Sequence, residues 1–303
     1  MLDRWVGGVL LTPSLALLAL VAIGPFLYAV ALGFTDLNYA LPGRDGNFVG
    51  LDNYRRLADD GVVWGSALTT LKFVAAAVTL EFVIGFSVAL LFYSHLMHRR
   101  FALTLMLIPM MLAPVAVGLL WKLMLQGDYG MAAYYLRSLG LADEQSALLG
   151  DPRLALITIV LIDVWQWTPF VTLVMLAGLL SLPREPFEAA IMDGAGRLRI
   201  FLDVTVPLLR PIIGLVVLLR GIDAFKEFDK VFILTGGGPG TATELLSIYI
   251  YRVAFRDWDL AYAAVCGFMV YLVVWILCTA VHALMTRQGG ARTYRATSAG
   301  PSR

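Results

Sequence analysis

Long apolar runs separated by short polar segments dominate the hydrophobic pattern of this 303-residue chain. Six of these runs reach the length of about 20 residues that a membrane-spanning helix requires. They cover approximately residues 9–34, 66–93, 101–125, 154–180, 211–234 and 260–286. The pattern therefore predicts an all-α, polytopic membrane protein with six transmembrane helices.

Composition supports the bilayer as the surrounding medium. The chain is 59% hydrophobic and 15% charged, whereas an ordinary soluble domain is about 45–50% apolar and about 25% charged. These values exclude a disordered chain, and a net charge of +1 excludes a nucleic-acid-binding protein that works through bulk positive charge. Cys266 and Cys278 lie in one apolar run and are interpreted as packing residues, not as a disulfide framework or a metal site.

The first apolar run raises the alternative of a secretory signal peptide. Its apolar stretch extends from Val9 to Leu32, which is longer than the roughly 7–15 residues of a signal-peptide core. No small-residue cleavage site follows it. We therefore expect this run to remain as a transmembrane helix.

The distribution of Lys and Arg among the polar segments predicts the orientation. With a cytoplasmic N-terminus, the inner segments contain eleven basic and five acidic residues, and the outer segments contain seven basic and twelve acidic residues. The inner segments are 1–8, 94–100, 181–210 and 287–303, and the outer segments are 35–65, 126–153 and 235–259. Because basic residues are enriched in cytoplasmic loops, both termini are expected in the cytoplasm.

These assignments predict three regions. Residues 1–65 form the first helix and an extracytoplasmic loop that folds as a small cap, residues 66–286 form five further helices, and residues 287–303 form a cytoplasmic tail. The inner loop 181–210 is longer than a hairpin requires. Pro186 suits the first turn of a new helix in this loop, and Pro211 is expected to open the fifth span.

Catalytic chemistry is not supported by the sequence. The glycine cluster from Gly236 to Gly240 lacks the Lys-Ser/Thr pair of a phosphate-binding loop and is interpreted as a tight turn. The three histidines, His95, His98 and His282, have no metal-ligand spacing and no plausible catalytic partners. We expect no catalytic residue, no metal site and no nucleotide hydrolysis by this chain alone.

The inner loop contains a short amphipathic helix. Its apolar residues recur at helical spacing and are Phe187, Ala190, Ile191 and Ala195. Glu188 lies in the first turn, where it favours the helix dipole. Small residues such as Ala189 and Gly194 keep the helix thin, so that it could enter a cleft on a partner. The alternative, a helix on the inner leaflet, is weaker because the polar face is not rich in Lys and Arg.

The same residues carry a resemblance to a known family. Glu188-Ala189-Ala190, followed by Asp193-Gly194-Ala195-Gly196 and later by Pro207, resembles the EAA loop of ABC-importer permeases. In that family the loop forms a coupling helix that docks in a groove of the ATP-hydrolysing subunit. The resemblance implies that seven residues contact the ATPase: Glu188, Ala189, Ala190, Asp193, Gly194, Ala195 and Gly196.

Further motifs are similar to those of carbohydrate permeases of the maltose type. They are Phe48-Val49-Gly50-Leu51-Asp52-Asn53-Tyr54, Phe228-Asp229-Lys230-Val231, Leu234-Thr235-Gly236-Gly237-Gly238-Pro239 and Tyr249-Ile250-Tyr251. The resemblance covers almost the whole chain from Pro25 to Ala283 and implies a type I ABC importer permease fold. It further implies a prokaryotic inner membrane, a heterodimer with a second, non-identical permease, and two ATP-binding cassette subunits that bind ATP and Mg. A solute-binding protein and a carbohydrate cargo complete the implied system.

Polar residues within the fourth span suggest a substrate path. A charge at mid-membrane costs at least about 2.5–3.5 kcal/mol on insertion scales, so Asp163 requires a reason to be there. Trp165, Gln166 and Trp167 follow it closely. Aromatic faces and carboxylate or amide groups together bind polyhydroxyl ligands. The alternative is that the tryptophans pack against other helices and that Asp163 pairs with a basic residue.

The fifth span carries a second group of charges. On an ideal helix one stripe contains Arg220, Asp223, Glu227 and Lys230, with Lys226 and Asp229 beside it. Two interpretations remain open, an ion-pair network that holds the helices together or a polar lining of the substrate path by Asp223, Lys226 and Glu227. Glu81 in the second span is expected to meet a partner on another span.

Two functional hypotheses follow from these observations. The first is a permease subunit of an ATP-driven importer that works by alternating access. The second is a secondary transporter in which Asp163, Asp223 and Glu227 relay protons or sodium ions. The absence of an evident inverted repeat and the elaborate inner loop favour the first hypothesis.

Overall fold

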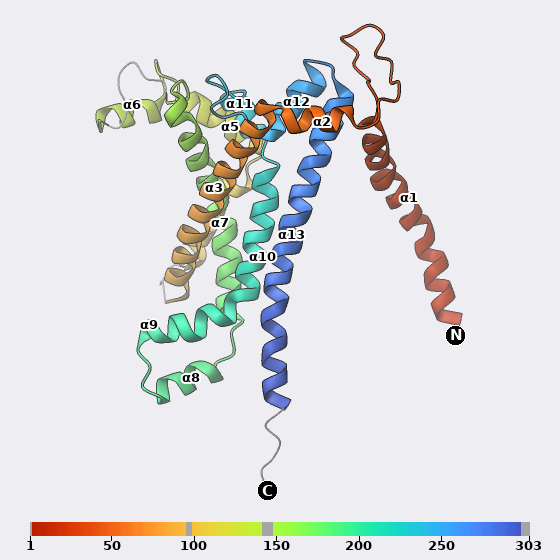
Figure 1. Ribbon diagram of the computed structural model, residues 1–303. Helices are drawn as coiled ribbons and strands as arrows, with labels where there is room; N and C mark the ends of the chain where they lie inside the picture. Colours follow the sequence, from red (N-terminus) through yellow and green to blue (C-terminus); the bar gives the residue numbers. More distant parts are fainter. Residues whose placement is uncertain (1, 95–98, 141–147, 298–303) are drawn as a thin grey trace. The chain divides into compact units, whose positions relative to one another are not determined.

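The structure is a computed structural model that describes residues 2–94, 99–140 and 148–297 (Figure 1). The described residues fold into helices joined by loops. The helices are α1 (Leu2–Leu32), α2 (Asp52–Asp59), α3 (Gly61–Tyr93), α4 (Arg99–Met111), α5 (Pro114–Met124), α6 (Met131–Ser138), α7 (Pro152–Leu180), α8 (Glu185–Met192), α9 (Arg197–Ile200), the π-helix η1 (Phe201–Thr205), α10 (Val206–Phe225), α11 (Asp229–Leu234), α12 (Leu246–Phe255) and α13 (Leu260–Thr297).

The chain divides into two compact units. The first comprises residues 1–65 and 246–273, and the second comprises residues 66–245 and 274–303. Residues 246–273 thus group with the N-terminal region, and the division into regions 1–65, 66–286 and 287–303 stays a prediction. Helix α13 continues through Thr297 into the predicted tail, of which residues 298–303 lie outside the described residues.

Five of the six predicted spans correspond to helical stretches of the described chain that are long and apolar enough to cross a membrane. They are Leu11–Leu32, Gly61–Tyr93, Pro152–Leu180, Arg197–Leu234 and Leu260–Val281. The third predicted span differs from a continuous helix, because α4 and α5 meet at an angle of 93°. Ala113, which precedes Pro114, adopts an extended conformation, as the steric demand of the proline ring favours. The predicted span over 101–125 is therefore a bent pair of helices and not one continuous helix.

The fifth predicted span also differs from an ideal helix. Pro211 does not open it but lies inside α10, and a continuous helical run reaches back through η1 and α9 to Arg197. At the other end the helix stops at Phe225, and α11 begins only at Asp229. The single helical stripe predicted for the charges of this span is therefore interrupted. The glycine cluster that follows is a tight turn as expected, with positive φ at Gly236, Gly237 and Gly240.

In the first unit, the carboxylate of Asp60 lies between the end of α2 and the start of α3. Asp60 accepts hydrogen bonds of 2.7 Å from the hydroxyl groups of both Tyr249 and Tyr262. Burial alone would raise the pKa of Asp60, but these two bonds and those from the backbone N–H groups of Val62 and Val63 lower it below its ordinary value. Asp60 is therefore an ionised carboxylate that joins the start of α3 to α12 and α13.

In the second unit, α7 packs at close range against both α3 and α10. A Cβ atom at Gly85 of α3 would lie 2.8 Å from the Cβ of Val171, and one at Gly178 of α7 would lie 2.7 Å from the Cδ1 of Ile212. Small residues at such contacts let helix backbones approach closely. The buried core between these helices includes Phe86, Phe92, Val171, Met175, Leu179, Leu209 and Val216.

Candidate functional site

The first candidate site is the short helix α8, which ends in a specific backbone motif. Gly194 follows the helix with a φ of +75°. The N–H of Gly194 donates to the carbonyl of Ile191 (3.0 Å), and the N–H of Ala195 donates to the carbonyl of Ala190 (2.9 Å). These two bonds define a Schellman motif, in which glycine is favoured because it adopts a positive φ without strain. Pro186 occupies the first turn as predicted.

The surface of α8 is largely open. Ile191 and Met192 are 62% and 86% exposed, and Glu188 and Ala189 are exposed beside them. The predicted apolar stripe is therefore divided, because Phe187 and Ala190 are half-buried whereas Ile191 faces away from the chain. Two large apolar side chains, those of Ile191 and Met192, are thus exposed on this helix.

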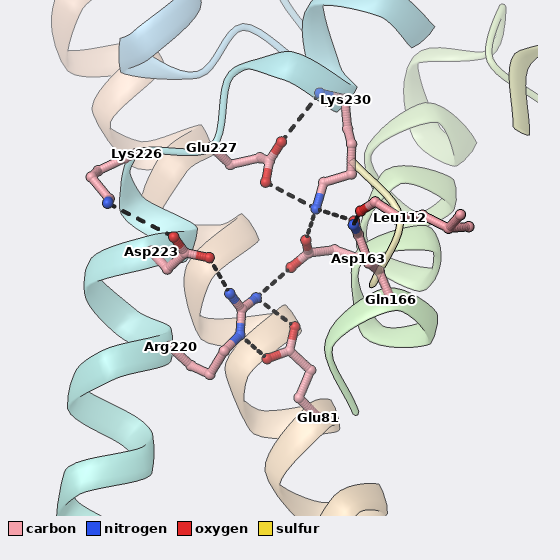
Figure 2. A network of polar contacts seen from close by, with 9 residues as sticks. All are labelled: Glu81, Leu112, Asp163, Gln166, Arg220, Asp223, Lys226, Glu227 and Lys230. Carbon is pink, nitrogen blue, oxygen red and sulfur yellow. Dashed lines mark hydrogen bonds and ion pairs between the residues drawn. The ribbon is translucent and has the colours of Figure 1, made fainter. Parts of the chain in front are cut away.

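The second candidate site is a buried network of charges centred on Arg220 (Figure 2). Its guanidinium makes a bidentate ion pair with Glu81 of α3, with hydrogen bonds of 2.6 and 2.8 Å. It donates a further bond of 2.9 Å to Asp163 of α7 and one of 2.7 Å to Asp223 of α10. Glu81 thus meets a partner on another span, as expected. Arg220 crosslinks three helices.

Lys230 of α11 forms the other half of the network. Its ammonium group donates to the second carboxylate oxygen of Asp163, to the side-chain oxygen of Gln166 (3.0 Å) and to Glu227 (2.9 Å). Gln166 in turn donates a bond of 3.1 Å to the carbonyl of Leu112, at the bend between α4 and α5. The network therefore also fixes the bent segment of the third span.

Burial and mutual pairing of the charges distinguish this network from a surface cluster. The side chains of Arg220, Lys230, Glu81 and Asp163 are at most 2% exposed. Three cations, Arg220, Lys226 and Lys230, face four carboxylates, Glu81, Asp163, Asp223 and Glu227. A buried charge without a partner is strongly destabilising, so these residues depend on one another. Asp223 and Lys226 form the open edge, at 43% and 62% exposed.

The aromatic residues of the fourth span do not gather at one point. Trp167 lies against the guanidinium of Arg220, 4.8 Å from the ring centre. Trp165 lies edge-on to Trp121 of α5 with the ring centres 5.5 Å apart. Asp163 and Gln166 are buried in the network between them. The pairing of Asp163 with basic residues, one of the two predicted alternatives, is therefore present, and a role of these residues in the substrate path remains a prediction.

Two central residues of the network, Arg220 and Lys230, were not among the predicted substrate-path residues. Their sequence signal was a positive charge within an apolar run, which requires a carboxylate partner. Within the described residues, no group of three or more His, Cys, Asp or Glu side chains is arranged to hold a metal ion.

Comparison with known proteins identifies the chain's relatives. A family model described as the inner membrane component of binding-protein-dependent transport systems matches residues 81–289. The trehalose/maltose transport system permease protein MalF of Thermococcus litoralis is 38% identical over 205 residues, which are 68% of this chain and 69% of that protein. The sulfoquinovosyl glycerol transport system permease protein SmoG of Agrobacterium fabrum is 33% identical over 265 residues, or 86% of this chain and 84% of the relative.

Solved structures share the fold. A bacterial alginate ABC transporter in complex with an alginate pentasaccharide-bound periplasmic protein contains a chain that superposes with a TM-score of 0.80. The superposition covers 94% of this chain and 95% of that one, at 19% sequence identity. At this identity the likeness establishes the fold alone.

The all-α fold with its apolar spans and the family match define the chain as a multi-pass permease of the inner membrane. The chain belongs to the family of inner membrane components of binding-protein-dependent transport systems, whose model spans both candidate sites. The resemblance to ABC-importer permeases that the sequence motifs indicated is thereby confirmed.

We predict that Arg220→Met lowers the stability of the folded bundle by about 3–5 kcal/mol, because it leaves Glu81 and Asp163 buried without this partner. Lys226→Met is the control, since its exposed ion pair contributes about 0–1 kcal/mol. Denaturant unfolding of the purified protein in detergent, followed by tryptophan fluorescence, measures both. Equal stability of the two variants would contradict the central role of Arg220.

Proposed function

We propose that this chain is one permease subunit of an ATP-driven, binding-protein-dependent importer of a carbohydrate. The observation that carries the proposal is α8, an exposed helix with the EAA pattern in the region that the family model matches. In the proposed mechanism, α8 is the point at which a separate ATP-hydrolysing subunit acts on this chain. The chain itself has no catalytic role.

The proposed cargo is a sugar, an oligosaccharide, a polyol or a glycerol-phosphate-like compound. Support comes from relatives named for trehalose and maltose, for sulfoquinovosyl glycerol and for trehalose. A solved transporter of the same fold is titled for import of the acidic polysaccharide alginate. These names agree on carbohydrate-like compounds and differ on the individual cargo, so the class is proposed here and not one compound.

The proposed ATPase contact consists of Glu188, Ala189, Ala190, Asp193, Gly194, Ala195 and Gly196. Its shape supports this role, because the Schellman motif fixes the end of α8 with two backbone hydrogen bonds and leaves Met192 at the tip 86% exposed. A preorganised apolar tip loses little conformational entropy when a partner groove covers it. Closure of the ATPase subunits would then move the spans by a rigid displacement of α8.

The complete assembly requires several further chains. We propose a second, non-identical permease, two ATP-binding cassette subunits that bind ATP and Mg, and an extracytoplasmic solute-binding protein. Both termini and α8 lie on the cytoplasmic side in this arrangement, as the distribution of basic residues favours. Alternating access follows from the different affinities of these partners for the inward-open and outward-open states.

The substrate path is proposed to pass the open edge of the charge network. Asp223 and Lys226 are partly exposed there, and Trp165 offers an aromatic face that is 38% exposed. Asp163, Gln166, Trp167 and Glu227 would support this edge from within the network. Carboxylate, ammonium and aromatic groups are side chains that suit a ligand with many hydroxyl groups.

A secondary transporter remains the alternative, with Asp163, Asp223 and Glu227 as an ion relay. It is less well supported, because each of the three carboxylates is paired with Arg220, Lys226 or Lys230. A relay carboxylate must instead exchange its proton or ion during the cycle.

The two mechanisms differ in their energy source. In proteoliposomes that contain the cognate partner subunits and binding protein, we expect uptake of labelled maltose or trehalose to require ATP and to persist with a protonophore. Glu188→Ala should reduce this uptake several-fold. Uptake that a protonophore abolishes and that ATP does not affect would favour the ion relay.

A substitution at the end of α8 tests the ATPase contact. Gly194→Trp should reduce co-purification of the cognate ATPase subunit at least tenfold, because it places a large side chain at the proposed interface. Gly140→Trp is the matched control, since Gly140 also has a positive φ (+70°) and open space within 4 Å of where a Cβ would lie, but belongs to the loop before α7. Equal co-purification of the two variants would contradict the proposed contact.

A double substitution tests the substrate path. Asp223→Asn combined with Lys226→Gln should lower uptake several-fold, mainly by raising the KM, because it changes only the exposed edge of the network. Unfolding midpoint and subunit assembly should stay unchanged, since Asn can still accept the hydrogen bond from Arg220. Unchanged uptake would restrict the network to a structural role.

A further inference from the structure

Helix α6 has an inverted distribution of apolar and polar side chains. Met131, Tyr134 and Tyr135 lie on one face at helical spacing and are 60–64% exposed, whereas Ala133 is buried. A surface helix of a soluble domain turns its apolar face inward. Tyr129 and Leu139, at about the same level of exposure, extend this apolar surface beyond both ends of the helix.

The position of α6 is fixed by the turn that precedes it. A Cβ atom at Gly130 would lie 2.4 Å from the carbonyl oxygens of both Met124 and Gln126, so this turn requires glycine. The guanidinium of Arg137, the only ionisable group in the helix besides its tyrosines, donates to the carbonyls of Gly127 (2.6 Å) and Ala133 (3.2 Å). Its charge is thus turned toward the chain's own backbone. The exposed face is left uncharged.

The helix lies at one end of the transmembrane bundle. It precedes the first residue of α7, whereas α8 follows the last. Since α7 has 29 residues, the two ends are about 43 Å apart at a rise of about 1.5 Å per residue, which matches a full bilayer with its headgroups. Figure 1 shows α6 running across the direction of α7 and α10 at this end. A helix in this orientation would lie parallel to the surface of a membrane that α7 spans, whichever way the chain is oriented.

The chemistry of the exposed face favours lipid over a protein partner. Tyrosine is enriched at membrane interfaces because its ring enters the acyl boundary while its hydroxyl group stays among the headgroups. A protein-binding patch normally has a charged or polar rim, whereas the one charged side chain of α6, that of Arg137, is turned toward the chain's own backbone. Its eight residues, about 12 Å in length, are also too few for a stable interface of roughly 800 Å² per partner.

We propose that α6 is an interfacial anchor that binds the bilayer surface through Met131, Tyr134 and Tyr135. In the orientation proposed above, this surface is the outer leaflet. The anchor would hold the bent α4–α5 segment, to which α6 is joined, at a constant depth in the membrane. The inference depends on the exposed face and the geometry of α6, and not on the identity of the cargo or of the ATPase.

The test measures the membrane depth of α6 directly. Tyr135→Cys, in a chain with Cys266→Ser and Cys278→Ser, is labelled with the fluorophore NBD and placed in phosphatidylethanolamine/phosphatidylglycerol nanodiscs. We expect blue-shifted emission and stronger quenching by lipids with a doxyl group at acyl carbon 5 than at carbon 12. A label at Asp45→Cys, on an exposed loop, should be quenched by aqueous iodide instead.

The same labels in the fully assembled transporter separate lipid from protein contacts. Lipid quenching that persists in the assembly supports the anchor. Iodide quenching at position 135 would show a water-exposed helix and overturn the proposal. Protection from both quenchers in the assembly would show that a partner chain covers the face, which also overturns it.

A second set of variants tests the tyrosines themselves, with the label at Met131→Cys. Tyr134→Glu with Tyr135→Glu should reduce quenching by the carbon-5 doxyl lipid several-fold, and Tyr134→Trp with Tyr135→Trp should preserve it. Gel filtration of both variants establishes that they are folded. Equal quenching in the two folded variants would contradict a role for the tyrosines.

Discussion

A buried guanidinium is the constraint on which the bundle depends. Arg220 is 2% exposed in an apolar helix and can be accommodated only if carboxylates neutralise it there. Those carboxylates come from different helices, Glu81 from α3 and Asp163 from α7. The ion pairs therefore set the register of α3, α7 and α10 relative to one another. Apolar packing alone would tolerate a shift of one helix along another, but these directional hydrogen bonds would not.

The break between α10 and α11 is a consequence of the same requirement. Arg220 and Lys230 bind the two oxygens of one carboxylate, that of Asp163. In a straight helix, two residues ten positions apart would be separated by about 15 Å along the axis and would face different directions. The interruption from Lys226 to Phe228 lets α11 turn so that Lys230 reaches the same carboxylate. The charged residues that the sequence analysis placed on one helical stripe are thus divided between α10, the interruption and α11, and Arg220 and Lys230 approach the same carboxylate.

Features that depend on local sequence could be predicted, whereas features that depend on contacts between distant segments could not. The apolar runs, the place of Pro186 in the first turn of α8 and the family resemblance depend on local pattern, and each could be predicted. The bend at Ala113 could not, because Pro109 lies inside α4 without breaking it whereas Pro114 begins a new helix. Likewise, the sequence left two interpretations of Asp163 open, binding of a polyhydroxyl ligand or pairing with a basic residue. Its ion pairs with Arg220 and Lys230 form only because α10 and α11 approach α7 in the folded chain.

The placement of the network also explains how α8 is connected to the membrane-embedded core. The two helical stretches that flank α8 are α7, which ends at Leu180, and the continuous run from Arg197 through α10. Each carries one member of the Arg220–Asp163 pair. Near α8, Phe201 of η1 also stacks on Phe86 of α3, with the ring centres 5.9 Å apart. The Arg220–Asp163 ion pair ties both stretches together at the level of the network, and it resists their separation there. In the proposed mechanism, this tie would let a displacement of α8 move the two stretches together.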